Sequence, residues 1–247
     1  MSTAPVADQQ RLLDVQAIDT RLAQLAHQRR SHPSLATLAE FSKRAQDLER
    51  VRAETAVLVS DTRRELAKAE TDVEQVANRA ARDQQRLDSG AGSAKDLQAM
   101  THELESLGRR KAALEEVELE VMERLEAAEG EVTAVTAQAE ALRADTERLE
   151  AERDAAFAQL DEAIAKAQAE RAATVEGIDE KLVALYERVR TQTGGLAAVA
   201  LRGESTESVN LSLTERAAIR DAQPEEVIQS EEYGYILVRV PATEGRP

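Results

Sequence analysis

The chain of 247 residues contains no cysteine. This absence excludes disulfide bonds, thiolate zinc sites and cysteine nucleophiles. Tryptophan is missing too, and two Phe and three Tyr make up an aromatic content of only 2%. Since aromatic side chains dominate the packing of most cores, this composition argues against a large compact core.

Long apolar runs are also absent. The longest one covers residues 196–201, far short of the roughly 18 to 20 residues that span a bilayer. Residues 1–14 lack the apolar segment of a signal peptide. The sequence therefore predicts a cytoplasmic protein without a membrane segment.

The sequence has no motif of an enzyme active site. Glycine-rich nucleotide-binding loops, a Walker loop and a nucleophile elbow are all absent. Paired glutamates such as Glu115 and Glu116 fall on the expected outer face of a helix, which offers no pocket for acid–base catalysis. We expect neither an enzyme nor a bound cofactor.

Charge is abundant and mostly negative. Charged residues make up 32% of the chain, and the formal net charge is −15 with a pI near 4.8. Such a mixture is typical of long solvated helices. A protein of this charge repels polyanions, so a nucleic-acid role would need a local basic patch.

A heptad pattern fills most of the chain and predicts long helices. Residues 7–28 form a first helix, which His32 and Pro33 interrupt. A second apolar seam runs from Leu38 to Leu87, and a third runs from Leu97 to Val189. The predicted seams include Leu12, Val15, Ile18 or Asp19, Leu22 and Leu25; Ala45, Leu58, Thr62 and Ala69; and Leu107, Val117, Val121, Ala128 and Leu142.

The glycine-containing segment at residues 88–93 predicts a turn between the two long seams. Folding back at this turn lets the seams cover each other, and arms of about 80 residues would extend ~120 Å. We therefore predict a mainly α fold in which residues 1–193 form one antiparallel coiled-coil hairpin, with a break near 32–33 and the tip near 89–93. In this register residues 12–25 pack near residues 160–185. Polar residues also occupy seam positions, where they either fix the register or extend past the seam: Lys111, Arg153 and Arg171.

The pattern changes after Thr193, where Gly194 and Gly195 end the helix. Residues 196–201 read as a short strand or buried turn, and residues 235–240 read as a strand. Ser212 and Glu215 form a capping box that opens a short helix through Ala222, and residues 224–229 lead to a loop. The sequence predicts a small α+β module at residues 194–240 and a flexible tail at 241–247.

Two stretches carry a family resemblance: KDLQAMTHELESLGRRKAALEEVELEVMERLE at 95–126 and PEEVIQSEEYGYILVR at 224–239. With RAARDQQRLDSGAGSAKDLQ and GGLAAVALRGESTESVNLSL, they resemble a bacterial family of coiled-coil hairpins with a C-terminal four-cysteine zinc ribbon. The chain is similar to an actinobacterial member that has lost all four zinc cysteines. The resemblance covers nearly the whole chain and implies a possible nucleic-acid or protein contact through the ribbon.

The resemblance also locates the lost zinc ligands. Thr206, Val209, Ser230 and Tyr233 match the positions of the family's cysteines, and none of them can be a thiolate ligand. The only histidines, His27, His32 and His102, lie in the coiled-coil region. We expect a ribbon-like module without zinc, packed on the adjoining helix, in which Val209 and Tyr233 fill the space of the metal.

The module should be held by apolar side chains instead, namely Leu196, Val199, Leu201, Leu211, Leu213, Ile219, Val227, Ile236 and Val238. Its carboxylates offer a weaker alternative, a site for a harder cation: Glu204, Glu207, Glu231 and Glu232.

The hairpin tip is locally basic. Residues 76–111 contain seven basic and five acidic residues, within a chain of net charge −15. The candidate partner-binding residues are Arg79, Arg82, Arg86, Lys95, Arg109, Arg110 and Lys111. A surface that docks an anionic partner has this composition, and so does a solvated face with ion pairs along the helix.

These observations favour a non-enzymatic adaptor or scaffold that binds protein partners through the hairpin and the C-terminal module. The alternative is a regulator associated with nucleic acid, or with the transcription or translation machinery, which acts through the basic tip or the ribbon. No aromatic residues are interleaved with the tip arginines, which argues against base stacking there. The sequence leaves open whether the chain is a monomer or a homodimer.

Overall fold

The computed structural model describes residues 2–90, 92–206 and 209–241. Its contacts form two compact units, Ala36–Glu150 and Met1–Leu35 with Ala151–Pro247. Most of the predicted tail at 241–247 and the central residue of the predicted tip lie outside the described residues. In the part of the chain that is described, no helix is both long and apolar enough to cross a membrane.

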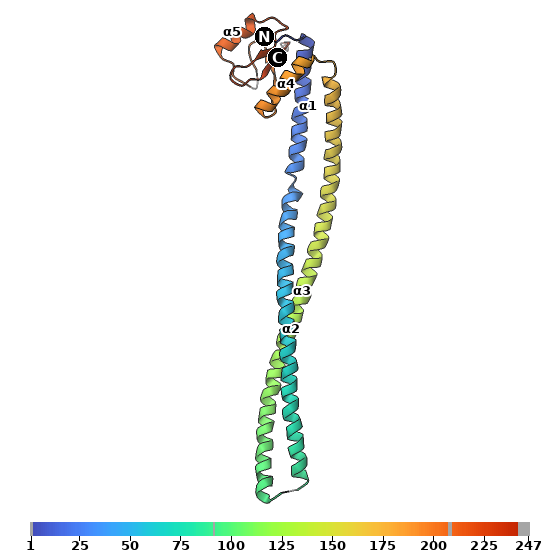
Figure 1. Cartoon of the computed structure of the whole chain (residues 1–247), viewed down its shortest axis with the longest axis vertical. Coiled ribbons are helices and arrows are strands. Elements are labelled where there is room, and N and C mark those ends of the chain that lie inside the picture. The colour runs from blue at the N-terminus through green and yellow to red at the C-terminus, as the bar shows by residue number, and fades with distance from the viewer. Residues whose placement is uncertain (1, 91, 207–208, 242–247) are drawn as a thin grey trace, which may run out of the picture. The chain divides into compact units, whose positions relative to one another are not determined.

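The unit Ala36–Glu150 is an antiparallel helical hairpin (Figure 1). It consists of most of α2 (Pro33–Asp88) and the first part of α3 (Ala94–Val175), with Gly90 at a φ of 67° in the connecting turn. Ion pairs such as Arg124 with Glu65, at 2.6 Å, link the two helices. The buried seam contains Thr55, Val59, Thr62 and Ala69 from α2 and Leu107, Val121, Ala128, Val135 and Leu142 from α3. The predicted hairpin is confirmed.

Three predicted seam residues are wrong. Leu58 is 51% exposed and Val117 is 48% exposed, and Ala45 is exposed as well. Val59 takes the place of Leu58, because the steps from Val51 to Thr55 and from Thr55 to Val59 are both four residues long, which is a stutter in the heptad.

Glu118 takes the place of Val117 for a different reason. The half-buried or buried positions of α3 alternate in steps of three and four residues, and Glu118 continues this alternation where Val117 would break it. In both regions the spacing of the buried positions along the helix outweighed the apolar character of the neighbouring side chain.

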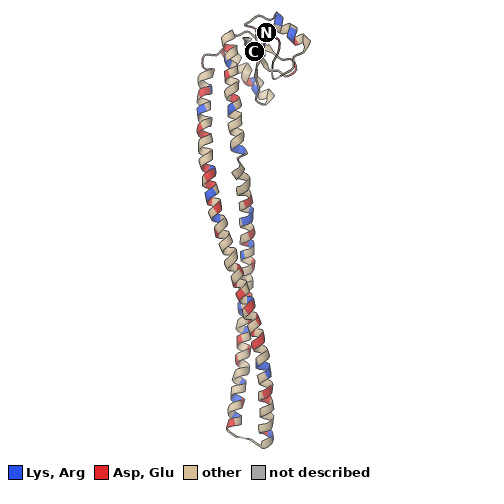
Figure 2. Ribbon diagram, turned by 180° about the vertical axis from the view of Figure 1, so that it is seen from behind, with Lys and Arg blue, Asp and Glu red and all other residues tan. Residues whose placement is uncertain are grey.

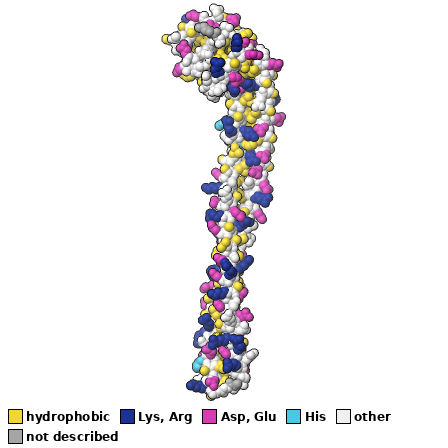
Figure 3. All heavy atoms as spheres, in the orientation of Figure 1, with side chains coloured by type: hydrophobic (Ala, Val, Ile, Leu, Met, Phe, Trp, Pro, Cys, Tyr) yellow, Lys and Arg dark blue, Asp and Glu magenta, His cyan; other side chains and the backbone are white. Residues whose placement is uncertain are grey.

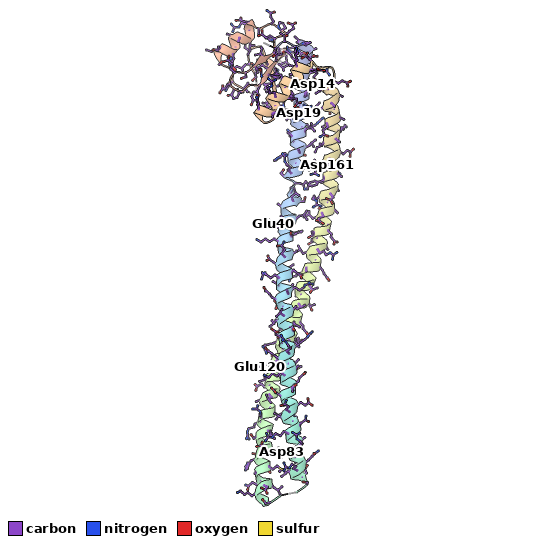
Figure 4. The ribbon with its side chains drawn as sticks, in the orientation of Figure 1. Asp14, Asp19, Glu40, Asp83, Glu120 and Asp161 are labelled. Atoms are coloured by element: carbon purple, nitrogen blue, oxygen red, sulfur yellow. The ribbon has the colours of Figure 1, made fainter. Side chains whose placement is uncertain are left out.

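The second unit contains α1 (Val6–Arg30), which runs antiparallel to the C-terminal part of α3. Arg29 pairs with Asp161 at 2.7 Å, and Arg21 pairs with Glu170. Asp161 lies between the two helices in Figure 4. The prediction that residues 12–25 pack near residues 160–185 is confirmed, and both candidates for the third seam position, Ile18 and Asp19, are buried.

The predicted unbroken helix to Thr193 is wrong. α3 ends at Val175, and a new helix α4 (Glu180–Thr193) follows a turn in which Gly177 has a φ of 82°. The carboxylate of Asp179 accepts a hydrogen bond from the N–H of Leu182 at 3.0 Å and caps α4. The apolar pattern does not reveal this turn, because Ile178 and Leu182 still fall at heptad positions. Both side chains are buried, but in the core that α4 forms with α1.

A three-stranded sheet follows α4 in the same unit. It consists of β1 (Ala198–Arg202), β2 (Ile228–Gln229) and β3 (Ile236–Val240) in the order β1-β3-β2, and α5 (Leu213–Asp221) lies between β1 and β2 in the chain. β1 and β3 are parallel, and β2 and β3 are antiparallel. The two predicted strands and the capped helix are confirmed, whereas β2 falls in a segment predicted as a loop.

The N-terminal residues complete this module. The N–H of Ala4 donates to the carbonyl of Glu225 at 2.8 Å, and the N–H of Val227 donates to the carbonyl of Ser2 at 2.9 Å. The chain therefore pairs its first residues with the segment that precedes β2.

Two apolar cores hold the unit. One joins α1 and α4 to β1 and β3, and the other lies between α5 and the sheet. Of the nine side chains predicted to hold the module, eight belong to these cores or pack against them. Leu213 is the exception and is 85% exposed, because α5 turns Glu215 inward.

Candidate partner-binding sites

A groove of about 510 Å³ lies between α2 and α3 near the hairpin tip. Its basic side chains are Arg79 and Arg82 from α2 and Arg110 from α3. Figure 3 shows Lys and Arg side chains gathered at this end of the hairpin. The rest of the lining is Asp72, Gln75, Val76, Asn78, Leu107 and Leu114.

Ion pairing divides the predicted tip residues into two groups. Arg79 pairs with Glu103 at 2.7 Å, and Lys111 pairs with Glu115 at 3.2 Å. Among the described residues, no carboxylate lies within 4.0 Å of the other five cations, namely Arg82, Arg86, Lys95, Arg109 and Arg110. The interpretation as a solvated face with ion pairs therefore holds for two of the seven residues.

The fold brings three of the seven residues together and leaves four outside the groove. Arg86, Lys95, Arg109 and Lys111 do not line it. Sequence reasoning missed the amides of Gln75 and Asn78, which share the groove with Arg79 and Arg82. The helical spacing of residues 75, 78, 79 and 82 could have revealed this face.

The four positions that match the zinc cysteines form two hydrogen-bonded loops. The hydroxyl of Thr206 accepts from the N–H of Val209 at 3.0 Å and donates to its carbonyl at 2.9 Å. In the second loop the N–H of Tyr233 donates to the hydroxyl of Ser230 at 3.4 Å. Side-chain hydroxyls and backbone groups close both loops.

A buried carboxylate anchors the second loop. Glu215 of α5 is only 6% exposed, and it accepts hydrogen bonds from the hydroxyl of Ser230 at 3.0 Å and from the N–H of Glu231 at 2.9 Å. Its other oxygen accepts from the N–H of Ser212 at 2.7 Å. The hydrogen bond from Ser212 lowers the pKa of Glu215 below its ordinary value of 4.5, against the opposing effect of burial.

The two side chains predicted to fill the metal space lie in different surroundings. Val209 is half-buried and packs against the second core. Tyr233 is 40% exposed and stacks on Tyr235 with ring centroids 5.8 Å apart. Tyr235 packs against the core, so that Tyr233 forms the outer layer of the stack.

The described residues of the predicted cation site do not form a metal-binding cluster. In residues 2–90, 92–206 and 209–241, no three His, Asp or Glu side chains lie close enough to hold one metal ion. Glu204 pairs instead with Arg220 at 2.8 Å. Glu207 lies outside the described residues.

A buried polar network joins α1, α3 and α4. Asp19 has a side-chain exposure of 4%; it accepts from the guanidinium of Arg171 at 2.6 Å and from the hydroxyl of Tyr186 at 2.9 Å. Burial, together with the hydrogen bond to Asp19, raises the pKa of Tyr186 above its ordinary value of 10.0. Gln16 extends the network to the sheet, since its side-chain oxygen accepts from the N–H of Ala197 at 2.6 Å.

This network is a structural feature. Its donors and acceptors satisfy one another, which is what a buried polar cluster requires for stability. Arg171 therefore fixes the packing of α1 on α3. This agrees with the interpretation that polar residues in the seam fix its register. Arg153 pairs with Asp154 at 2.7 Å, and Lys111 remains 42% exposed beside Glu115.

Comparison with known proteins gives two similar sequences from Mycobacterium tuberculosis. They are the uncharacterized protein Rv2229c of strain H37Rv and the uncharacterized protein MT2288 of strain CDC 1551. Each is 32% identical over 239 residues, which cover 96% of this chain and 97% of the relative.

Solved structures with a similar fold come from three bacteria. A Mycobacterium smegmatis protein has a TM-score of 0.81 and 32% identity, with 97% of this chain and 100% of that chain covered. CT398 from Chlamydia trachomatis has a TM-score of 0.69 and 14% identity, over 95% and 98% of the two chains. The HP0958 protein from Helicobacter pylori has a TM-score of 0.52 and 13% identity, over 98% and 100%.

The hairpin itself carries the family assignment. The sequence model described as the CT398-like coiled coil hairpin domain matches residues 15–194, which include α3, α4 and α2 in full. The resemblance to a coiled-coil hairpin family is thereby confirmed, while its zinc-ribbon part stays a prediction. With this match over most of its length, the chain belongs to the CT398-like coiled coil hairpin family.

Proposed function

We propose that this protein is a non-enzymatic adaptor that binds an acidic segment of a partner protein in the basic groove of its hairpin. The observation that carries the proposal is the pair Arg82 and Arg110, which line one groove without a carboxylate within 4.0 Å among the described residues. In a chain of net charge −15, cations left unpaired on one surface favour an external anion.

The groove also supplies neutral groups that a protein segment uses. The amides of Gln75 and Asn78 can donate to or accept from a backbone, and Val76, Leu107 and Leu114 add apolar surface. A protein–protein interface typically combines such an apolar centre with a polar rim. Acidic side chains of the partner would pair with Arg82 and Arg110.

The competing function is binding of nucleic acid by the same arginines. Phosphates are recognised by Lys and Arg through counterion release, and this mode needs no aromatic stacking. The groove contains no aromatic ring, and Asp72 adds a negative charge to its lining, so that an acidic protein segment is the better match. The same experiment separates the two.

The test measures binding of two fluorescent probes by anisotropy, a glutamate-rich helical peptide and a single-stranded RNA oligonucleotide. We expect the peptide to bind at low salt and to weaken as salt rises. The double variant Arg82→Glu/Arg110→Glu should weaken peptide binding at least about tenfold, because like charges then face each other.

The matched control is Lys43→Glu/Arg44→Glu, which changes the net charge equally at exposed positions of α2 away from the groove. This variant should bind the peptide within about twofold of the parent. Equal weakening by both variants would reduce the effect to overall charge and contradict a specific groove. RNA binding that depends on Arg82 and Arg110 without peptide binding would establish the nucleic-acid function instead.

A further inference from the structure

A pair of stacked tyrosines forms an exposed aromatic surface on the C-terminal module. Tyr233 and Tyr235 stack with ring planes 3° apart and centroids 5.8 Å apart. They are two of only three tyrosines in a chain without tryptophan. The inner ring, Tyr235, packs against the core of α5 and the sheet, and Tyr233 is 40% exposed.

The position of these rings is fixed by buried groups. The backbone of the loop is held by the N–H of Gly234, which donates to the carbonyl of Ser230 at 2.8 Å, and by the N–H of Ser230, which donates to the carbonyl of Tyr235 at 2.8 Å. Ser230 is itself 3% exposed and bound to Glu215. The outer ring is therefore presented on a loop that the module core orders before any ligand binds.

The charges around the rings are negative. Residues 194–241 contain eight acidic and four basic residues. Among the described residues, no Lys or Arg lies within 4.0 Å of the carboxylates of Glu231 and Glu232, which are neighbours of Tyr233 in the loop. The negative charge of Glu232 raises the pKa of Tyr233 above its ordinary value.

Two of the four basic side chains of the module, Arg220 and Arg239, are already engaged within it. Arg220 pairs with Glu204 at 2.8 Å, and Arg239 donates to the carbonyls of Ile219, Ala222 and Gln223 at 3.1 to 3.3 Å. A phosphate ligand would find the carboxylates of Glu231 and Glu232 beside the rings. A cation finds both an aromatic face and negative charge there.

We propose that Tyr233, stacked on Tyr235 and flanked by Glu231 and Glu232, binds an arginine side chain of a basic peptide segment in a partner protein. A guanidinium is planar and stacks on aromatic faces, so it would add a third layer to the two rings. Its N–H groups would then donate to the neighbouring carboxylates. Leu213, 85% exposed at the start of the helix that carries Glu215, offers apolar contact for the rest of the segment.

This site goes beyond the proposed role of the hairpin groove and has the opposite charge preference. It would let one adaptor hold an acidic segment and a basic segment at chemically distinct surfaces. The two sites are tested by separate variants, so either proposal can fail alone.

The test uses the full-length chain and a fluorescein-labelled peptide of Gly, Ser and Arg residues at low salt. We expect saturable binding that Tyr233→Ala weakens about two- to thirtyfold, the range of a cation–π contact. Tyr233→Phe retains the ring and should stay within about twofold of the parent. Glu231→Gln/Glu232→Gln should weaken binding and flatten its dependence on salt.

Three controls make the result decisive. The groove variant Arg82→Glu/Arg110→Glu should leave binding of the basic peptide intact, and thermal melting should show that Tyr233→Ala still folds. A peptide with Lys in place of Arg should bind more weakly, because an ammonium cannot stack as a plane. Equal binding by the parent and Tyr233→Ala, absence of binding at low salt, or preferential binding of single-stranded RNA by the same rings would overturn the proposal.

Discussion

At the scale of single residues, the buried carboxylates of Glu215 and Asp19 each hold several parts of the fold together through hydrogen bonds. Glu215 collects donors from Ser212, Ser230 and Glu231, and Asp19 collects donors from Arg171 and Tyr186. Both are 6% exposed, so each charge depends on its hydrogen bonds rather than on water. Both therefore give sharp predictions.

Replacing Glu215 by Gln should lower the free energy of unfolding at pH 7 by about 1–3 kcal/mol, because the amide nitrogen would face donors. The pKa of Glu215 is lowered in the folded chain, so its stabilising contribution is present above 4.5 and is lost as the pH falls below 4.5 toward the folded-state pKa. Urea unfolding of the parent and variant should therefore differ at pH 7 and converge in acid.

The exposed carboxylate of Glu225 serves as the control for this experiment. Glu225→Gln changes the same charge near the same sheet and should shift stability by no more than about 0.5 kcal/mol. Hydrogen exchange at the amides of Ser212 and Glu231 adds a local readout, which should accelerate in Glu215→Gln. A pH-independent difference between the parent and the variant would contradict the assigned role.

Replacing Asp19 by Asn should cost about 3–5 kcal/mol, because Arg171 would keep a partly buried charge without its main partner. Asp14 lies on the same helix, is exposed and is labelled with Asp19 in Figure 4. Asp14→Asn should be nearly neutral when both variants are compared by chemical denaturation. Combining Asp19→Asn with Arg171→Met should cost less than the sum of the two single changes.

At the scale of elements, the heptad spacing predicts the hairpin, but it does not predict which residues are buried at every position of the seam. Charged residues are spread along both helices, as Figure 2 shows, while most of the buried seam residues are small or β-branched, such as Thr62 and Val121. In α2 the stutter at Thr55 and Val59 moves the seam away from Leu58. An apolar residue beside a seam is therefore not evidence of burial.

Alanine substitutions test this register directly. Val59→Ala should lower the free energy of unfolding by about 1–2 kcal/mol, because two buried methyl groups are lost. Leu58→Ala removes more apolar surface, yet it should stay within about 0.5 kcal/mol of the parent, because Leu58 is 51% exposed. Thermal unfolding followed by circular dichroism measures both. A larger loss of stability in Leu58→Ala than in Val59→Ala would show that Leu58, and not Val59, occupies the seam.

At the scale of the whole molecule, the two proposed binding sites carry opposite charges. Among the described residues, Arg82 and Arg110 of the hairpin groove and Glu231 and Glu232 of the C-terminal module have no ion-pair partner within 4.0 Å, in a chain of net charge −15. The proposed adaptor would use both, because opposite charge preferences keep two partner segments from competing for one surface.

The chain should be a monomer in solution, since each long seam is covered by the other within one chain. Static light scattering should give a mass near 27.0 kDa. A mass twice as large would show that hairpins pair between chains, and raising the salt concentration would then test whether the groove arginines hold that dimer.

The sequence by itself determined the features that depend on neighbours along the chain. Heptad spacing predicted the hairpin, Ser212 and Glu215 predicted the cap of α5, and the missing cysteines excluded a thiolate zinc site. The heptad and the cap depend on residues only a few positions apart, where helix geometry converts spacing into contact.

Only the tertiary structure decided which polar groups meet. Tyr186 and Asp19 are 167 residues apart in the chain, and Gln16 reaches the N–H of Ala197 across 181 residues. The hydrophobic periodicity also did not predict three other features. These are the helix break at Gly177, the pairing of Ser2 with Val227 and the burial of Glu215. Side-chain hydrogen bonds have no sequence period, so their partners are fixed only when the helices and strands pack.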